Sequence, residues 1–180
     1  LPSLRFEYGL FVETVVKPLL WTENEQPGEV IFQREPTLRV QLPGQKALNK
    51  PHIDYSYMRQ PTEVNVWLPL TQVTAKNTLY AESVPGKKDF TPFIAKWGVG
   101  VLFYGSQCLH YSVTNEETDA TRISLDFRCI RDDHFIHDYI APFSKQKKPL
   151  FRLGEHYTST AIEREFRNSI SQLPQCQTIN

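Results

Sequence analysis

The stretch from residue 121 to 130 alternates between polar and apolar side chains, and this pattern limits the possible folds more than any other feature of the sequence. One phase holds Arg122, Ser124, Asp126 and Arg128, and the other holds Ile123, Leu125, Phe127 and Cys129. A period of two is typical of a β-strand with two different faces. Charged side chains on one of these faces need a polar cavity or solvent beside them. We therefore expect a strand with an apolar side and a side that faces a polar space.

Shorter segments of the same kind precede this stretch. They span residues 37–42, 63–70, 78–84, 99–104 and 110–114, with turn-forming Pro-Gly pairs between several of them. Short strands joined by hairpin-length links predict a mainly β core. A closed double-sheet jelly roll of the cupin kind, a double-stranded β-helix, is the natural way to bury such strands. We expect this core to occupy residues 37–130.

The N-terminal flank is predicted to be helical. Leu4, Tyr8, Phe11, Val15 and Leu19 recur at helical spacing, which indicates an amphipathic helix over residues 3–20. Its apolar stripe is expected to cover one face of the sheet. The segment that follows, residues 22–36, is rich in Glu, Asn, Gln, Pro and Gly and is predicted to be a loop.

The C-terminal tail, residues 131–180, is expected to lie outside the core. Within it, residues 144–155 have the composition of a mobile basic loop, and residues 161–170 have that of a short polar helix. At 180 residues the chain has the size of one domain. We therefore expect a single domain over residues 1–180, with α-helices flanking the β core.

The composition argues against several classes of protein. Twenty basic and twenty acidic residues leave no net charge, and without a long Lys/Arg block the electrostatic signature of a nucleic-acid binder is missing. No apolar run approaches the roughly 20 residues that span a bilayer, and the first residues lack the uncharged core of a signal peptide. The expected partner is a small-molecule substrate, with neither nucleic acid nor membrane, and the oligomeric state stays open.

The cysteines indicate a reducing compartment. Cys108, Cys129 and Cys176 are odd in number and form no CxxC motif. These features are typical of reduced thiols rather than of a secreted disulfide framework. We therefore expect a cytoplasmic protein.

Three residues form a candidate metal site. His52 and Asp54 are two positions apart, so an extended backbone points them to the same side. His110 lies before the next predicted strand. Two imidazoles and one carboxylate are the ligands of the facial iron site, which leaves three positions on a ferrous ion open for chemistry. A short His-x-Asp motif also arises by chance, and His110 alone could equally be a core histidine.

The order of these motifs resembles a known enzyme family. His52-x-Asp54, His110 and Arg122-x-Ser124 follow one another as in the Fe(II)- and 2-oxoglutarate-dependent dioxygenases. The segments 63–70, 77–86 and 122–128 resemble in particular the bacterial oxygenase-like proteins of streptomycin-type biosynthesis, within the phytanoyl-CoA dioxygenase-like group. The resemblance covers about residues 37–130 and implies an oxidoreductase with a double-stranded β-helix fold.

The resemblance implies a role for each residue. His52, Asp54 and His110 would hold Fe(II) as catalytic metal ligands, with 2-oxoglutarate and O2 as cosubstrates. Arg122 and Ser124 would bind the distal carboxylate of 2-oxoglutarate, because a planar guanidinium matches a carboxylate in two contacts. Asn65 and Trp67 would line the cosubstrate or substrate pocket, although Trp67 could equally be core.

By the same resemblance, we expect the protein to oxidise a C–H bond of a small polar metabolite or polar side chain by hydroxylation, with release of succinate and CO2. Halogenating relatives replace the carboxylate ligand by Gly or Ala, so the presence of Asp54 favours hydroxylation or a related oxidation. Weaker patterns make Arg128, Arg39 and Gln41 candidates for substrate binding.

Other interpretations remain open from the residues alone. Arg122 could pair with Asp126 or Glu117, and Arg128 could close a structural ion pair with Asp126. The whole site could belong to a non-catalytic metal-binding cupin-like module or to a zinc hydrolase. A rival metal site is also present in residues 132–138, which contain two His and three Asp. The substrate is expected to meet loops 45–50, 55–62 and 85–97 and the tail, where Tyr55, Tyr57, Arg59, Lys87 and Lys88 suggest a polar ligand.

Overall fold

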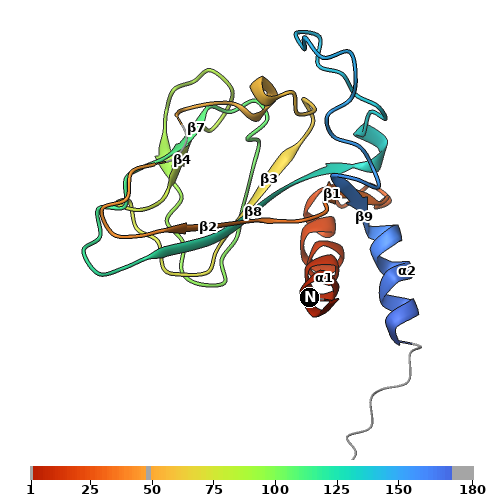
Figure 1. Cartoon of the computed structure of the whole chain (residues 1–180), viewed down its shortest axis with the longest axis horizontal. Coiled ribbons are helices and arrows are strands. Elements are labelled where there is room, and N and C mark those ends of the chain that lie inside the picture. The colour runs from red at the N-terminus through yellow and green to blue at the C-terminus, as the bar shows by residue number, and fades with distance from the viewer. Residues whose placement is uncertain (1, 48–49, 172–180) are drawn as a thin grey trace, which may run out of the picture.

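The computed structural model describes residues 2–47 and 50–171 and consists mainly of antiparallel β-sheet with few helices (Figure 1). The strands are β1 Val30–Gln33, β2 Thr37–Gln41, β3 Val64–Pro69, β4 Leu79–Ala81, β5 Thr91–Pro92, β6 Val101–Phe103, β7 His110–Ser112, β8 Arg122–Arg131 and β9 Tyr157–Ser159. The helical segments are α1 Pro2–Phe11, η1 Val12–Val16, η2 Lys17–Leu19, η3 Asp54–Tyr57, η4 Asp132–His134 and α2 Thr160–Ser171. The expected mainly β chain with flanking helices is confirmed.

Strand β8 lies at the centre of the larger sheet. The order of strands in this sheet is β6-β3-β8-β1-β9, and β2 also pairs with β8. Because β8 is long, β2 pairs with its first half and β1 with its last residues along the same edge. The smaller sheet has the order β5-β4-β7. Figure 1 shows β8 crossing the molecule toward the end of the sheet where α1 and α2 lie.

The register of the larger sheet places the predicted polar residues on one face. Opposed residues of antiparallel strands point to the same side. Arg128 is opposite Asn65, Asp126 is opposite Trp67, and Arg122 is opposite Gln41. The alternation seen in the sequence therefore continues across three strands. Residues of both sheets line one small cavity on this side, so the polar face looks toward the smaller sheet.

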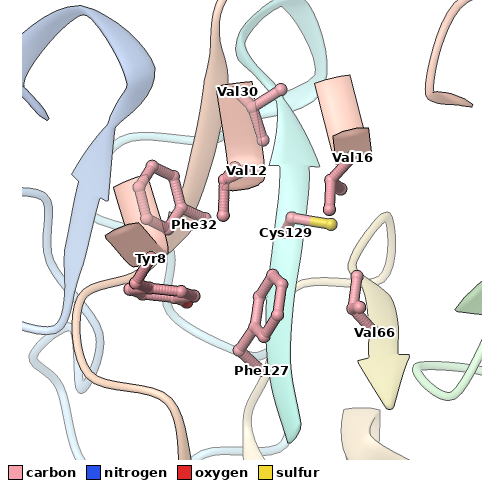
Figure 2. Close-up of a cluster of buried hydrophobic side chains, with 8 residues drawn as sticks. All are labelled: Tyr8, Val12, Val16, Val30, Phe32, Val66, Phe127 and Cys129. Carbon is pink, nitrogen blue, oxygen red and sulfur yellow. The ribbon is translucent and has the colours of Figure 1, made fainter. Parts of the chain in front are cut away.

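The other face of the sheet carries the main apolar core. Its buried members are Tyr8, Val12, Val16, Val30, Phe32, Val66, Phe127 and Cys129 (Figure 2). The ring of Tyr8 packs edge-on against Phe32 and Phe127, with centroids 5.4 and 5.0 Å apart. Its hydroxyl donates to the carbonyl of Gln33 at 2.7 Å. The N-terminal helix thus covers the apolar face, as expected.

The apolar stripe of this helix differs from the predicted one. Tyr8, Val12 and Val16 are buried, whereas Leu4, Val15 and Leu19 are exposed. For Val15 and Leu19 the reason is the π-helical turn η1, whose i→i+5 bonding widens the helix and shifts its phase, whereas Leu4 lies before this turn, on the exposed side of α1. A stripe drawn at regular α-helical spacing therefore follows the wrong side after Tyr8.

Two strands lie where the sequence predicted none. Residues 22–36 were expected to be a loop, but they contain β1, whose Val30, Ile31 and Phe32 are all buried. The predicted tail contains β9, which pairs with β1. Both strands have three or four residues, and β1 is buried on both faces, so neither shows a period of two. The larger sheet consequently extends beyond residues 37–130.

The predicted C-terminal helix is present as α2, and it packs against α1. Glu163 of this helix is buried and accepts from Arg5 in two contacts of 2.8 and 3.0 Å. The helix is therefore amphipathic rather than simply polar. Cys108 and Cys129 are free and buried, and Cys176 lies outside the described residues. In the part of the chain that the structure describes, no helix has the length and apolarity required to cross a membrane.

The core predicts a clear contrast between two substitutions. Phe127 is 2% exposed and contacts both Tyr8 and Phe11, so Phe127→Ala should lower the free energy of unfolding by about 3 to 5 kcal/mol. Leu38 is 60% exposed, and Leu38→Ala should change it by about 0.5 kcal/mol or less. Urea denaturation of both variants measures the difference. Equal effects would contradict the assignment of the core.

Candidate metal centre

The structure brings His52, Asp54 and His110 together. One ligand atom from each lies within 4.8 Å of the others. Asp54 Oδ1 is 3.5 Å from His52 Nε2 and 3.7 Å from His110 Nε2. Asp54 and His110 are buried, and His52 is partly exposed. The three groups predicted to converge therefore surround one point at the edge of the protein interior.

Backbone pairing explains this convergence. His52 and His110 form an isolated antiparallel bridge, in which each amide donates to the other carbonyl at 3.0 and 2.9 Å. Ile53 is extended, so Asp54 returns to the same side as His52. The amide of Asp54 then donates to the carbonyl of Gly105 at 3.0 Å, where the chain turns into η3. Main-chain hydrogen bonds thus fix the segment that carries His52 and Asp54 against the one that carries His110.

Both imidazoles are oriented for metal binding. His52 Nδ1 lies 2.8 Å from the carbonyl of Lys50, and His110 Nδ1 lies 3.0 Å from the carbonyl of Cys108. A carbonyl oxygen only accepts, so each Nδ1 carries the proton and each Nε2 is left with its lone pair. This arrangement is typical of histidines that bind a metal through Nε2.

The two oxygens of Asp54 have different partners. Oδ2 accepts from Arg128 Nε and from Asn65 Nδ2, both at 2.8 Å, whereas Oδ1 faces the imidazoles. Burial alone would raise the pKa of Asp54. The hydrogen bond from His52 and the charge and hydrogen bonds of Arg128 and Asn65 outweigh burial and hold this pKa far below its usual range. Asp54 is therefore an anion whose Oδ1 points toward the two imidazoles, where a cation could replace the proton of His52.

The pKa values of the two histidines move in opposite directions. The hydrogen bond to Asp54 raises the pKa of His52 above 6.5, against the opposing effect of burial. Burial lowers the pKa of His110, which outweighs its contacts with Cys108 and Asp54. In the metal-free protein, a proton on His52 therefore competes with a bound metal.

Arg128 and Asn65 support the metal ligand Asp54 and also line the small cavity that reaches both histidines. They were candidates for substrate and cosubstrate binding, and the structure places both against the outer oxygen of Asp54. Arg128 Nη1 also reaches Asp126 and Gln33 at 3.4 Å. The structural ion pair considered for Arg128 thus includes Asp126, but its shorter contact is with Asp54. The period of two in the sequence predicted that Arg128 and Asn65 share a face. It did not predict that both would contact Asp54.

A glycine that the motif search missed supports this arrangement. A Cβ on Gly105 would lie 2.7 Å from the side-chain amide of Asn65. Real Cβ atoms do not approach this closely, so only glycine lets Asn65 lie against Asp54. The sequence contains a weak signal, because Gly105 immediately ends a predicted strand.

Arg122 is buried without an acidic partner. Its side chain is 3% exposed, and its only direct partner among the described residues is the carbonyl of Asn77, 3.2 Å from Nη1. Its Nε is buried without a hydrogen-bond acceptor. Burial, together with repulsion from Arg39, lowers the pKa of Arg122 to about 10, although Asp126 partly opposes this shift. The alternative pairs with Asp126 and Glu117 do not form in the described structure.

Other buried polar atoms near Arg122 also lack partners. They are Ser124 Oγ, Trp67 Nε1 and Gln41 Oε1. Buried polar groups are nearly always hydrogen-bonded in native proteins, so a cluster of exceptions indicates a missing ligand or water. Arg122 and Gln41 line a cavity of about 200 Å³, and Trp67 lines a neighbouring one of about 30 Å³ that reaches both histidines. Arg39 and Ser112 line both cavities.

Arg39 and Gln41 are tied into the walls of these cavities. Arg39 forms an ion pair with Asp126 and remains partly exposed. Gln41 donates to the carbonyls of Gln45 and Val113 at 2.9 and 3.0 Å, which connects β2 to the end of β7. Both residues lie beside Arg122, as their shared strand face predicted.

The rival metal site does not assemble. Within residues 2–47 and 50–171, the one cluster of three metal-binding side chains is that of His52, Asp54 and His110. In segment 132–138 the His and Asp side chains are exposed. Asp133 pairs with Arg131 at 2.7 Å. The zinc hypothesis for this segment is therefore wrong.

Comparison with known proteins identifies a relative of this chain. No protein-family model matches the sequence. The chain is 36% identical to the streptomycin biosynthesis protein StrG of Streptomyces griseus over 150 aligned residues, and the alignment covers 80% of the chain. The chain is a homologue of StrG. It spans 66% of the length of that relative, just under two thirds. The resemblance predicted from the motifs is thus confirmed.

Solved structures confirm the fold of this StrG homologue. A 2OG-Fe(II) oxygenase family oxidoreductase from Burkholderia pseudomallei matches 73% of the chain and 57% of its own length, with a TM-score of 0.53 and 15% identity. The non-heme alpha ketoglutarate dependent epimerase SnoN from nogalamycin biosynthesis matches 73% and 63%, with a TM-score of 0.51 and 14% identity. At these identities the likeness concerns the fold alone.

The packing of Gly105 against Asn65 can be tested by one added methyl group. Gly105→Ala should push the flexible amide of Asn65 off Asp54 and weaken divalent metal binding about 10-fold to 100-fold. Gly100→Ala is the matched control, because the nearest atom to its Cβ is 3.6 Å away. Competition with a chromogenic chelator measures both affinities. An unchanged affinity in Gly105→Ala would remove Asn65 from the support of the metal site.

The opposite pKa shifts predict how pH acts on the site. In metal-free protein, His52 should titrate above 6.5 and His110 below it. Metal affinity should therefore fall as the pH drops through the pKa of His52, with release of its proton on binding. The raised pKa of His52 also stabilises the metal-free fold at low pH, and this contribution is lost as the pH rises through that value. NMR titration of the imidazole C–H signals measures both values, and the reverse order would contradict the geometry.

Proposed function

We propose that this protein is a non-haem Fe(II)- and 2-oxoglutarate-dependent dioxygenase that oxidises, by hydroxylation, a C–H bond of a small polar metabolite or polar side chain. The observation that carries the proposal is the combination of two features. Two imidazoles and a carboxylate surround one point, and a buried guanidinium without an acid lines a cavity that shares wall residues with the one at the imidazoles. The homology with StrG and the oxygenase fold support it.

The residues present fit ferrous iron. His52 Nε2, His110 Nε2 and Asp54 Oδ1 are neutral nitrogen donors and an anionic oxygen, the donor set of the facial site. The second oxygen of Asp54 is occupied by Arg128 and Asn65, so this carboxylate would bind through one oxygen. Three positions would then remain for other ligands. Bound iron would supply the activation of O2.

The residues also fit 2-oxoglutarate. Its distal carboxylate would neutralise Arg122, and its oxygens would accept from Ser124 Oγ and Trp67 Nε1, which have no other partner. The cavity at Arg122 and the smaller one at the histidines share two wall residues. A molecule with an anionic group at each end would span them. The polar face of the larger sheet would thereby orient the cosubstrate and exclude water from it.

The same proposal includes the type of β fold, the kind of substrate and the cellular compartment. The two sheets that enclose these cavities would form a double-stranded β-helix, with the metal ligands at one end. The substrate would be a small molecule, and the free buried thiols suit the reducing cytoplasm. A cupin-like binding module or a zinc hydrolase would have no need of a buried guanidinium that lacks an acid, so the oxygenase is the better explanation of Arg122.

The metal and the cosubstrate can be tested together without a substrate. Anaerobic addition of Fe(II) and 2-oxoglutarate should produce a visible charge-transfer band, and His110→Ala should abolish it, because chelation requires all three protein ligands. His137→Ala is the matched control, since His137 is exposed and outside the cluster. In air, addition of an oxidisable substrate should then release succinate. Activity that continues under strict anaerobiosis would favour a hydrolase, and absence of succinate with any substrate would favour a binding module.

The role of Arg122 gives a separate expectation. Arg122→Leu should weaken 2-oxoglutarate binding by about 2 to 5 kcal/mol, the scale for a buried charge pair that loses one member. Iron binding should be retained. Arg152→Leu is the surface control, because Arg152 is half exposed and pairs with Asp138. Titration of the anaerobic band with 2-oxoglutarate measures the change, and an unchanged midpoint in Arg122→Leu would remove this assignment.

A further inference from the structure

A further polar cavity is separate from the two at Arg122 and at the histidines and has no role in the proposed chemistry. It has a volume of about 330 Å³ and is lined by Gln33, Arg34, Glu35, Arg59, Glu155 and His156. These residues come from β1 and the turn after it, from the end of the η3 turn, and from the segment before β9. We call this cavity the Arg34/Arg59 cleft.

Two guanidiniums line this cleft without a carboxylate partner. Arg34 Nη1 donates to the carbonyl of Gly154 at 2.9 Å, and Arg59 Nη1 donates to the hydroxyl of Tyr157 at 3.4 Å. In the described structure neither forms an ion pair, defined as a nitrogen within 4.0 Å of a carboxylate oxygen. Glu35 and Glu155 line the same cleft but stay outside this distance. Each guanidinium has five N–H donors, so most of them remain unused.

The guanidinium of Arg59 is held in place. It stacks over the ring of Phe151, with its central carbon 3.7 Å from the ring centroid. The hydroxyl of Tyr157, which it contacts, belongs to a fully buried side chain that donates in turn to Glu63. A planar donor group that is already fixed loses little entropy on binding an anion. Burial raises the pKa of Glu63, and the charge of nearby Arg59 partly opposes this rise. Because Arg59 forms no direct ion pair with that acid in the described structure, its remaining N–H groups can meet an anionic group in the cleft.

The cleft is also connected to the metal ligands. Gln33 lines it and accepts from Arg128 Nη1 at 3.4 Å, and Arg128 Nε binds Asp54 Oδ2 at 2.8 Å. Arg59 follows the η3 turn that begins with Asp54. A molecule anchored in the cleft would thus lie two side chains away from the metal ligand Asp54.

We propose that the Arg34/Arg59 cleft binds an anionic group of the substrate, which narrows the substrate class to small metabolites that carry a carboxylate or a phosphate. That the bound anion belongs to the substrate rests on the proposed oxygenase function, whereas the existence of the anion site does not. This site is distinct from Arg122, which lies at the other end of β8 from Arg128. The acids Glu35 and Glu155 balance the charge of the cleft, so its selectivity comes from the geometry of the two guanidiniums and not from a net positive field.

The test is a calorimetric titration of the full chain with inorganic phosphate and, separately, with acetate. Wild type should bind at least one of these anions, and the preferred one names the group. Arg59→Gln and Arg34→Gln should each weaken that binding about tenfold, the scale of one lost charge-assisted hydrogen bond. Arg122→Leu should leave the anion affinity of the cleft unchanged. Arg131→Gln is the matched control, because Arg131 already pairs with Glu25 and Asp133.

Two outcomes overturn the proposal. In the first, the affinity for the anion is unchanged in both Arg34→Gln and Arg59→Gln. In the second, Arg122→Leu abolishes all anion binding, which would place the only anion site at Arg122. If one of the two variants fails to fold, the other still decides, because Arg34 is exposed and its substitution disturbs no core contact. The titration requires neither iron nor 2-oxoglutarate. Its failure would therefore leave the oxygenase proposal intact, and failure of the charge-transfer test would leave the anion site intact.

Discussion

The buried ion pair between Arg128 and Asp54 is the interaction on which the metal centre depends. It joins the central strand β8 to the turn that follows His52, across 74 positions of the sequence. A carboxylate that is 2% exposed would ordinarily take up a proton, and the hydrogen bond from His52 together with this pair keeps Asp54 ionised. Removal of one member of such a pair leaves an uncompensated buried charge and is strongly destabilising. The strand that organises the sheet therefore also supports the metal ligand.

The charges on the polar face of the sheet explain why one arginine is left for a ligand. Arg39, Arg122 and Arg128 share this face with the acid Asp126, and Asp54 approaches it from the η3 turn. Arg39 pairs with Asp126, and Arg128 pairs with Asp54 and Asp126. Arg122 pairs with neither acid. An isolated buried charge is costly, so its presence is best explained by a bound anion. The absence of an acidic partner for Arg122 in the described structure thus directs the proposed cosubstrate to this residue.

The C-terminal segment contributes to the site more than its position in the sequence suggests. Tyr157 reaches back 94 positions to Glu63, and Gln60 exchanges two hydrogen bonds with the main chain of Ile136. Phe143 packs on Tyr55, one residue after the ligand Asp54. This segment therefore builds part of the wall beside the metal centre. Substrate selection, as proposed for the Arg34/Arg59 cleft, depends on a region that the sequence alone describes as a tail.

The sequence by itself determined the two-faced strands and the set of metal-binding residues, because alternation and residue chemistry are local properties. It left β1 and β9 undetected, since strands this short, or buried on both faces, have no period of their own. Only the tertiary structure decided which polar groups pair. Periodicity assigns Arg122 and Arg128 to the same face, but it does not reveal that one meets Asp54 and the other meets no acid. That difference arises from strand register and from a turn far away in the chain, which place the few available carboxylates beside one guanidinium and not the other.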